Sequence, residues 1–340
     1  MNNLLWEWLI ESRLDAYSAN EAFNGPSSCD AGPMWCFQRF GQSTTPLPDG
    51  RSVLIGGEHE DHYDSDFCIY NDIVIAAENE RPRILGYPRE VFPPTDFHSA
   101  TLIGGRIVVI GNLGYPEDRR ADLTQGLAVD CNDWSVSRID FSGNAPGWIH
   151  GHRAMLQDDA RILITGGKVD RGAGFSLAEN IDDWLLHVDG WRWERLTKRQ
   201  WPRFEIHRRD KTSNHLWELR HLGWATTVKW HDREEQEQRL RERLGGEPRL
   251  DLLPQLYRPP IDHEVIPQSA DEYSVYRIRV GGVVIRFVED MYCIQVTFEG
   301  ESPADVIESV RAHICKSLES LERTPVVYAE IPNEGLRNEP

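Results

Sequence analysis

The feature that most constrains the fold of this chain is a short run of Val, Leu and Ile that ends in glycine and occurs three times. The runs occupy residues 52–55, 107–110 and 162–165, and the glycines that end them, Gly56, Gly111 and Gly166, are spaced by 55 residues twice over. A fixed period of this kind is typical of repeat architectures, in which each repeat is one small unit of secondary structure. The sequence therefore predicts three copies of one structural repeat.

Each copy has the pattern expected of a four-stranded sheet. A first strand leads into the apolar run through a tight turn, marked by Asp49-Gly50 in the first copy and by Gly104-Gly105 in the second. The run itself indicates a strand buried on both faces. A polar loop and two further strands follow, at residues 67–70 and 73–75, 126–130 and 134–139, and 184–189 and 191–196. Four strands per repeat at this period indicate the blade of a β-propeller.

Residues around the runs resemble the kelch repeat. In the second copy His98-Ser99-Ala100-Thr101-Leu102 stands before the run, and Asp130 and Trp134 stand after it; in the third copy the equivalents are residues 152–156, Gly166-Gly167, Asp189 and Trp193. The resemblance covers residues 37–196 and implies a kelch-like β-propeller or partial propeller. The first copy departs from the pattern with Gln42 in place of the histidine and no tryptophan, and the second departs with Asn112 in place of the second glycine.

We expect a mainly β protein in which a small α+β domain follows the propeller. The expected regions are an N-terminal helix and lead-in at 1–36 (helix from Asn3 to about Ala19), the propeller at 37–232, a helix and proline-rich linker at 233–267, the α+β domain at 268–332 and a disordered tail at 333–340. The last blade is degenerate and rests on residues 217–230, interpreted as a strand pair. The α+β domain is expected to have strands at 273–280, 283–288, 292–298 and 326–328 and one helix at 302–321.

Charge and cysteine usage narrow the class of partner and the compartment. The formal net charge of −18 disfavours nucleic acid and anionic membranes and favours a basic partner. The six cysteines contain no CxxC pair, which favours reduced thiols and a cytoplasmic protein. The chain contains no apolar run of the roughly 20 residues that a spanning helix needs, so we expect no membrane segment.

The densest group of polar and charged side chains follows the first glycine pair. Loops of repeat proteins often carry the contacts with a partner, so we predict a partner-binding face from this loop and its counterparts. The predicted partner-binding residues are Glu58, His59, Glu60, Asp61, His62, Tyr63, Asp64, Tyr115, Glu117, Asp118 and Phe175. His59 and His62 with a carboxylate have the chemistry of a metal site but no recognised spacing, so we predict no metal and no cofactor.

Two other functions stay open at this point. The first is a metal-assisted enzyme with a funnel site on the propeller axis that uses His59, His62 or His98, although we find no catalytic motif and interpret His98, His150 and His152 as repeat-determined structural residues bonded to a loop backbone. The second is a single-stranded nucleic-acid binder. Its rings and cations would come from Trp191-Arg192-Trp193, residues 199–204 and His207-Arg208-Arg209.

The preferred hypothesis is a non-catalytic protein that binds a basic protein through an acidic kelch-like loop face. One concrete version is an immunity-type inhibitor of a basic toxin, for which acidic complementarity would speed association. The sequence leaves the partner's identity, the number of blades and the oligomeric state open.

Overall fold

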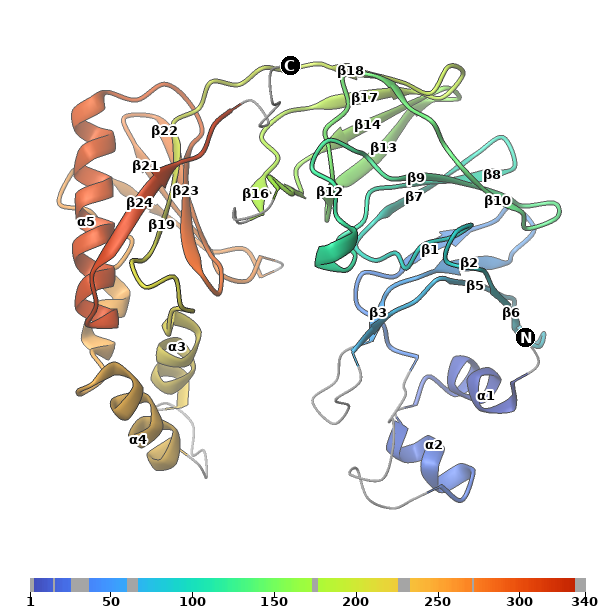
Figure 1. Cartoon of the computed structure of the whole chain (residues 1–340), viewed down its shortest axis with the longest axis horizontal. Helices are drawn as coiled ribbons and strands as arrows, with labels where there is room; N and C mark the ends of the chain where they lie inside the picture. Colours follow the sequence, from blue (N-terminus) through green and yellow to red (C-terminus); the bar gives the residue numbers. More distant parts are fainter. Residues whose placement is uncertain are drawn as a thin grey trace. The chain divides into compact units, whose positions relative to one another are not determined.

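The computed structural model describes residues 3–14, 16–25, 37–59, 67–172, 177–225, 233–270 and 272–333. Over these residues the protein is mainly β and contains several separate sheets. The chain forms two compact units, unit 1 (Met1–Lys198) and unit 2 (Arg199–Glu334), which carry the blue-to-green and the yellow-to-red parts of Figure 1.

Unit 1 contains three antiparallel four-stranded sheets that follow one another along the chain, and the three repeated runs form their second strands. The first sheet contains β1 (Ser43–Pro46), β2 (Ser52–Ile55), β5 (Asp72–Ala76) and β6 (Arg83–Gly86); the second contains β7 (Ser99–Ile103), β8 (Arg106–Ile110), β9 (Gly126–Asp130) and β10 (Val136–Arg138); the third contains β13 (Arg153–Asp158), β14 (Arg161–Thr165), β17 (Trp184–His187) and β18 (Arg192–Arg195), with β11 (Ser142–Gly143) parallel to β18.

The second strand of the middle sheet is buried on both faces because this sheet packs between the other two. Alternate residues of a strand point to opposite faces. Ile107 and Val109 therefore lie in one apolar cluster with the first sheet, whereas Val108 and Ile110 lie in another with the third sheet. This two-sided packing is the physical reason for the unbroken apolar run in the sequence.

Helices cover the remaining face of the first sheet. These are α1 (Leu4–Ser12) and α2 (Ala16–Ala22). The prediction of one helix from residue 3 to about residue 19 was wrong, because Arg13 adopts a left-handed backbone with a φ of 57° and ends α1. Leu9 of α1 packs against Leu54 and Val74, so the helix takes the place that a neighbouring sheet has elsewhere in unit 1.

A buried ion pair reinforces this end of unit 1. The Arg39 side chain donates from Nη1 and Nη2 to the two carboxylate oxygens of Asp72, at 2.6 and 3.0 Å. Its guanidinium lies 3.5 Å from the centre of the Tyr70 ring. Arg39 thus fills space beside the first sheet while its charge stays paired and stacked.

Two of the repeated glycines, Gly56 and Gly111, are required by the close approach of the next segment, whereas a Cβ on Gly166 would meet nothing within 4 Å. Gly56, Gly111 and Gly166 all have positive φ, which glycine adopts without strain. A Cβ atom on Gly111 would lie 2.3 Å from the carbonyl oxygen of Ile149, in the segment that leads into the third sheet. On Gly56 it would lie 2.1 Å from the carbonyl oxygen of Thr95, in the segment that leads into the second.

Unit 2 is an antiparallel sheet of six strands packed against helices. In sheet order the strands are β20 (Glu264–Ile266), β21 (Val275–Val280), β22 (Val283–Glu289), β23 (Cys293–Phe298), β19 (Arg203–Arg208) and β24 (Val326–Glu330). The helices are α3 (Leu216–Ala225), α4 (Arg233–Leu244), the 3-10 helix η2 (Leu250–Gln255) and α5 (Ala304–Glu322). α5 lies along one face of the sheet and buries Val310, Ile314 and Leu318 in its core (Figure 1).

The structure corrects the predicted boundary of the propeller region. Residues 199–225 belong to unit 2, where β19 pairs with both β23 and β24. Arg208 at the end of β19 also donates from Nη1 to the buried Glu322 of α5, at 2.8 Å. The expected linker at 233–267 is likewise part of unit 2, since α4 and η2 pack into its core and β20 pairs with β21.

The predicted strand pair at 217–230 was wrong over its described part. Residues 216–225 form α3, in which Leu216, Leu219 and Leu222 recur at every third position and pack into the core of unit 2. Residues 226–232 lie outside the described residues. The predicted strands and helix of the C-terminal domain are confirmed as β21, β22, β23, α5 and β24. The sheet has two further strands, β19 and β20, that local patterns left unassigned.

Two further expectations concern the membrane and the C-terminal tail. Among the described residues, none of the helices combines the length and the apolar character needed to cross a bilayer. Residues 334–340 of the predicted disordered tail lie outside the described residues, whereas Asn333 donates from its side-chain amide to the carbonyl of Trp201 at 3.0 Å.

Two glycine substitutions test the close approach between sheets. Gly104 and Gly111 both have positive φ, but a Cβ on Gly104 would meet nothing within 4 Å. We expect Gly111→Ala to lower the free energy of unfolding of unit 1 by about 1–3 kcal/mol more than Gly104→Ala, because only the former forces two sheets apart. Urea unfolding of the two variants measures the difference, and equal losses would contradict the packing described for Gly111.

Candidate partner-binding face

Loops that connect the second and third strands of the three sheets leave unit 1 at one end. Consecutive antiparallel strands place alternate connections at opposite ends of a sheet. The loops after β2, β8 and β14 therefore share an end with the segments that lead into the next sheet, and backbone bonds between them confirm this: Gly57 N–H donates to Thr95 O and Asn112 N–H to Ile149 O, both at 2.9 Å. We call this end of unit 1 the loop face.

The predicted partner-binding residues that the structure describes belong to loop-face connections. Glu58 and His59 form β3 (Glu58–His59), which pairs with β4 (Cys68–Ile69), and Tyr115 stands just before the short 3-10 helix η1 (Pro116–Asp118). The remaining predicted residues lie outside the described residues, and they are Glu60, Asp61, His62, Tyr63, Asp64 and Phe175.

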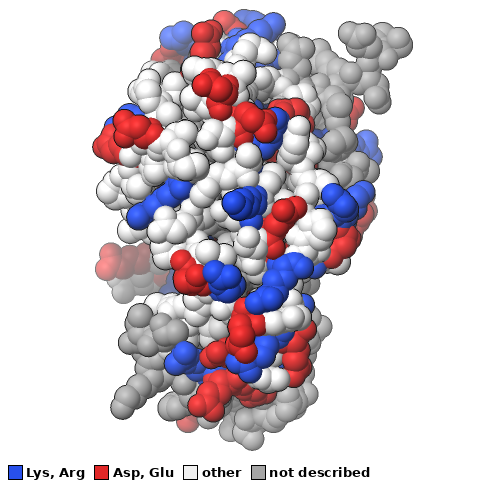
Figure 2. Space-filling model, turned by 90° about the vertical axis from the view of Figure 1, so that its left-hand side faces the viewer, with Lys and Arg blue, Asp and Glu red and all other residues white. Residues whose placement is uncertain are grey.

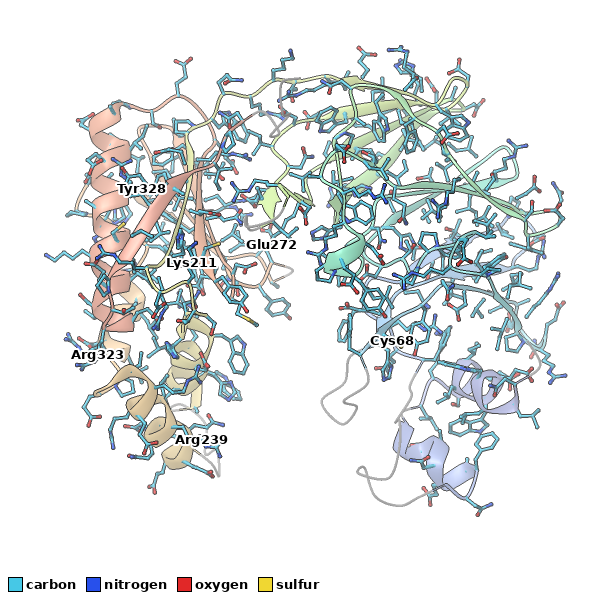
Figure 3. All side chains as sticks on the ribbon, viewed as in Figure 1. Cys68, Lys211, Arg239, Glu272, Arg323 and Tyr328 are labelled. Carbon is cyan, nitrogen blue, oxygen red and sulfur yellow. The ribbon has the colours of Figure 1, made fainter. Side chains whose placement is uncertain are left out.

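The loops of the first and second sheets are joined through Tyr115. The backbone N–H of Ile69 in β4 donates to the Tyr115 hydroxyl at 2.9 Å. The ring of Phe67 meets the Tyr115 ring edge-on, with the ring centres 5.9 Å apart. Figure 3 labels Cys68 of β4, which lies between Phe67 and Ile69 in the sequence. Two residues of the predicted set that are distant in sequence, Glu58 and Tyr115, are thus held on neighbouring segments.

The acidic residues of η1 differ in their surroundings. Glu117 is exposed, whereas Asp118 forms an ion pair with Arg89. Arg119 turns inward and donates from Nε to the carbonyl of Leu113 at 2.9 Å and from Nη2 to that of Gly114 at 3.1 Å. The negative charge expected at this loop is therefore offset at Asp118 and fully available at Glu117.

His59 is not a surface residue. Its side chain is 1% exposed and meets the Tyr70 ring edge-on, at 6.4 Å between ring centres. Glu58 beside it is half-buried. The prediction that His59 contacts a partner directly was therefore wrong, and its place is in the packing beneath the loop.

Buried histidines link successive sheets. His98, which precedes β7, forms a hydrogen bond from Nε2 to the Ser43 hydroxyl of β1 at 2.7 Å. His152, which precedes β13, does the same with the Ser99 hydroxyl of β7 at 2.8 Å. The structural interpretation of these histidines is supported, but their partner is the serine hydroxyl of the preceding sheet rather than a loop backbone.

The same junctions contain a second set of backbone bonds. Phe97 N–H donates to the carbonyl of Gly41 at 2.9 Å, and Gly151 N–H donates to the carbonyl of Phe97 at 2.7 Å. All three residues have positive φ. The segments before β1, β7 and β13 therefore adopt equivalent conformations, and each bonds to the segment before it.

Burial keeps the junction histidines uncharged. Loss of solvent is the main cause that lowers the pKa of His98 to about 3, and the nearby His152 lowers it further. Burial likewise lowers the pKa of His152 to about 4, and for His150 burial together with Lys168 and Arg119 lowers the pKa to about 3. Among the described residues, no hydrogen-bond partner reaches the buried second ring nitrogens, which are Nδ1 of His98 and His152 and Nε2 of His150, so a proton added there would be unsatisfied.

Sequence reasoning missed two residues that organise the loop face. Asn112, which interrupts the glycine pair of the second copy, accepts from Asp96 N–H at 3.0 Å and donates to the carbonyl of Pro94 at 2.9 Å. Asp96 is fully buried and accepts from Gly114 N–H at 2.7 Å, and burial raises the pKa of its carboxyl. The departure from the Gly-Gly pattern at position 112 was the signal that could have identified this cluster.

Several rings and cations of the Trp/Arg segment are engaged within the unit to which each belongs. Trp193 lies in the core of the third sheet, and Trp191 packs against the same cluster. Arg208 is engaged by Asp210 and by the buried Glu322. These two rings are thus taken up by packing and this cation by ion pairing.

The metal interpretation gains no support from the geometry that the structure describes. Over the described ranges, His, Cys, Asp and Glu side chains form no group of three or more with the arrangement of a metal site. His62, which the metal interpretation also needs, lies outside those ranges.

Comparisons with known proteins give little further information. No protein-family model matches the chain. Among solved structures, that of YjhT is similar with a TM-score of 0.35 and 12% sequence identity, over 48% of this chain and 52% of that chain. The chain thus spans about half the length of YjhT.

The neutral histidines predict a pH-dependent stability of unit 1. Their pKa is 6.5 in ordinary surroundings and about 3 to 4 in the folded chain, so the unfolded state binds more protons below pH 6.5. Stability is therefore complete above pH 6.5 and declines as the pH falls towards 4, by about 1.4 kcal/mol per pH unit for each histidine. Urea unfolding between these pH values measures the slope.

Two variants assign the pH slope to individual groups. His98→Gln, which introduces the residue that Gln42 provides in the first copy, should reduce the slope by the share of one histidine. Ser43→Ala removes the hydroxyl partner of His98 and should cost about 1 kcal/mol at every pH while it leaves the slope unchanged. An unchanged slope in His98→Gln would contradict the buried, uncharged state of His98.

Proposed function

We propose that the chain is a non-catalytic protein-binding protein whose unit 1 is a kelch-like partial β-propeller and whose loop face binds a basic protein. The observation that carries the proposal is the bond between Ile69 N–H and the Tyr115 hydroxyl, which holds the loops of two successive sheets as one surface. A surface built from several loops on a rigid scaffold is the usual form of a binding site.

The regular junctions between sheets support the partial propeller. Three four-stranded sheets follow one another along the chain, and the bonds of His98 to Ser43 and of His152 to Ser99 repeat the same contact at both junctions. Each sheet would be one blade. α1 takes the place of a neighbouring blade on the first sheet, which is consistent with an array that ends there rather than a closed ring.

The state of the histidines argues against the enzyme alternative. A funnel site on the propeller axis would use His59, His62 or His98 as acid, base or ligand, and His62 lies outside the described residues. His98 is engaged by Ser43 at 2.7 Å, and His59 is enclosed beside Tyr70. Both side chains contribute to packing between segments, so binding is the function that the arrangement of these residues supports best.

The charge of the chain supports a basic partner. The net charge of −18 would attract a cationic protein over a distance of about 10 Å, the screening length at moderate salt, and raise its association rate. The exposed Glu117 of the loop face would supply part of the local field, and the sequence carries further acidic residues between β3 and β4. An immunity-type inhibitor of a basic toxin in the cytoplasm is the concrete version of this proposal.

Charge reversal at the two ends of the sheets tests the proposal. The variant Asp61→Lys/Asp64→Lys/Glu117→Lys alters the loop face. The matched control Glu80→Lys/Asp133→Lys/Asp159→Lys changes the net charge equally, but its residues lie in exposed turns at the opposite end of the three sheets. A partner captured from the native cell and purified should associate about tenfold or more slowly with the first variant and nearly normally with the control.

The test compares association rates at low and high salt and between the two variants. Association rates measured by surface plasmon resonance should fall as salt is raised from about 50 to about 300 mM, because screening weakens the attraction between opposite charges. Equal rates for the two variants would remove the loop face from the proposal. Binding that is insensitive to salt would remove the basic partner.

A further inference from the structure

Helix α3 exposes a row of rings on the surface of unit 2. Trp217, His221 and Trp224 are spaced by four and three residues and therefore lie on one face of the helix. The Trp217 and His221 rings are stacked with their centres 5.2 Å apart and planes 11° apart, and His221 and Trp224 lie 5.6 Å apart. Trp217 is 71% exposed and Trp224 is 51% exposed, although tryptophan is usually well buried.

The turn between β22 and β23 continues this apolar surface. Met291 and Tyr292 at the turn are 64% and 54% exposed. Asn214, two residues before α3, donates from its backbone N–H to the carbonyl of Met291 at 2.8 Å and from its side chain to that of Asp290 at 2.7 Å. The turn is therefore fixed against the start of α3. We call Trp217, His221, Trp224, Met291 and Tyr292 the aromatic patch.

Charged residues beside the aromatic patch are already paired within unit 2. Arg220 forms an ion pair with Glu289, and Glu218 accepts from Arg243 Nη1 at 2.8 Å. These two arginines are thus neutralised by carboxylates rather than available to phosphates. Over the described residues, the two arginines beside the ring faces are thus engaged, which makes single-stranded nucleic acid the less favoured occupant.

Another face of unit 2 is charged, whereas the aromatic patch is apolar. Figure 2 shows a face on which Lys and Arg alternate with Asp and Glu. Arg311 of α5, for example, pairs with Glu308 and lies 3.4 Å from Glu330. A surface of mixed charge is well solvated by water, whereas a contiguous exposed apolar patch is typical of an interaction site.

A second copy of the chain fits both the charge and the area of the patch. Two copies with a net charge of −18 each repel one another, so they can meet only through a surface that adds no further negative charge. At about 200 Å² for a large side chain, the exposed parts of the two tryptophans, Met291 and Tyr292 amount to roughly 500 Å². Two copies would bury about 1,000 Å², which is the lower limit for a specific interface.

We propose that the chain forms a weak two-fold dimer in which the aromatic patch of one copy packs against that of another. A two-fold axis brings the same surface of both copies together, so the rows on the two α3 helices cross and each Trp217 contacts rings of the partner. This dimer uses a different surface from the proposed binding of a basic protein, because the patch is on unit 2 and the loop face is on unit 1.

Analytical ultracentrifugation of the full chain tests the dimer. Wild-type protein should show a monomer–dimer equilibrium with a dissociation constant on the order of 10 µM, as expected for an interface of this size. Trp217→Ala/Trp224→Ala should remain monomeric at about 100 µM, at least tenfold above that constant. Tyr328→Ala, which removes a similarly exposed ring on the edge strand β24, should dimerise like the wild type (Figure 3).

Salt separates this proposal from the proposed function. Raising the salt concentration should tighten the dimer, because screening reduces the repulsion between two acidic chains, whereas it should weaken binding to a basic partner. A wild-type chain that is monomeric at about 100 µM, ten times the expected constant, would overturn the dimer. So would a double variant with an unchanged urea midpoint that still dimerises, or a wild-type chain whose patch binds an oligothymidine at low salt in place of a second copy.

Discussion

The contact between one backbone and the next at the junctions of unit 1 is the constraint on which the rest of that unit depends. Gly57 and Asn112 donate to carbonyls of the segment that leads into the following sheet, and at Gly56 and Gly111 even one extra carbon would collide with those carbonyls. Because the backbones meet so closely, the strands next to them interleave without gaps and bury both faces of the middle sheet. The same contact places the loops of successive sheets side by side, so the geometry of the loop face follows from it.

Much of unit 1 could be predicted from the sequence because its structure is local and repeated. The apolar runs and their glycines marked β2, β8 and β14, since strand, turn and loop fall in the same order in each copy. Unit 2 was harder. β19 lies between β23 and β24 although more than 80 residues separate it from either partner, and no local pattern reveals such a pairing. The helix at α3 was missed because its tryptophans suggested strands, while the leucines that fix its buried face recur at helical spacing.

The loop face was predicted in outline but not in the role of each residue. Position in the repeat was sufficient to place Glu58, Tyr115 and Glu117 at one end of the sheets. It gave no indication that His59 is enclosed or that Asp118 is engaged by Arg89, because burial and ion pairing depend on neighbours from other repeats. The interpretation of His98 and His152 had the correct role and the wrong partner, since the serine that each one contacts lies a full repeat earlier in the chain.

The two residues of each junction contact come from different sheets in a fixed order, and this order determines where a further repeat could be inserted. Every junction uses a histidine from the later sheet and a serine from the earlier one, so a duplicated 55-residue segment inserted between the second and third sheets would find a matching neighbour on both sides. No further repeat could be added at either end, because the serine and histidine that form the contact are missing there. Arg153 stands at the position of Ser43 and Ser99, and at the other end α1 and the Arg39–Asp72 pair occupy the first sheet. The two ends therefore fix where the repeats stop but not how many there are, because a whole repeat could be gained or lost between them without altering either end.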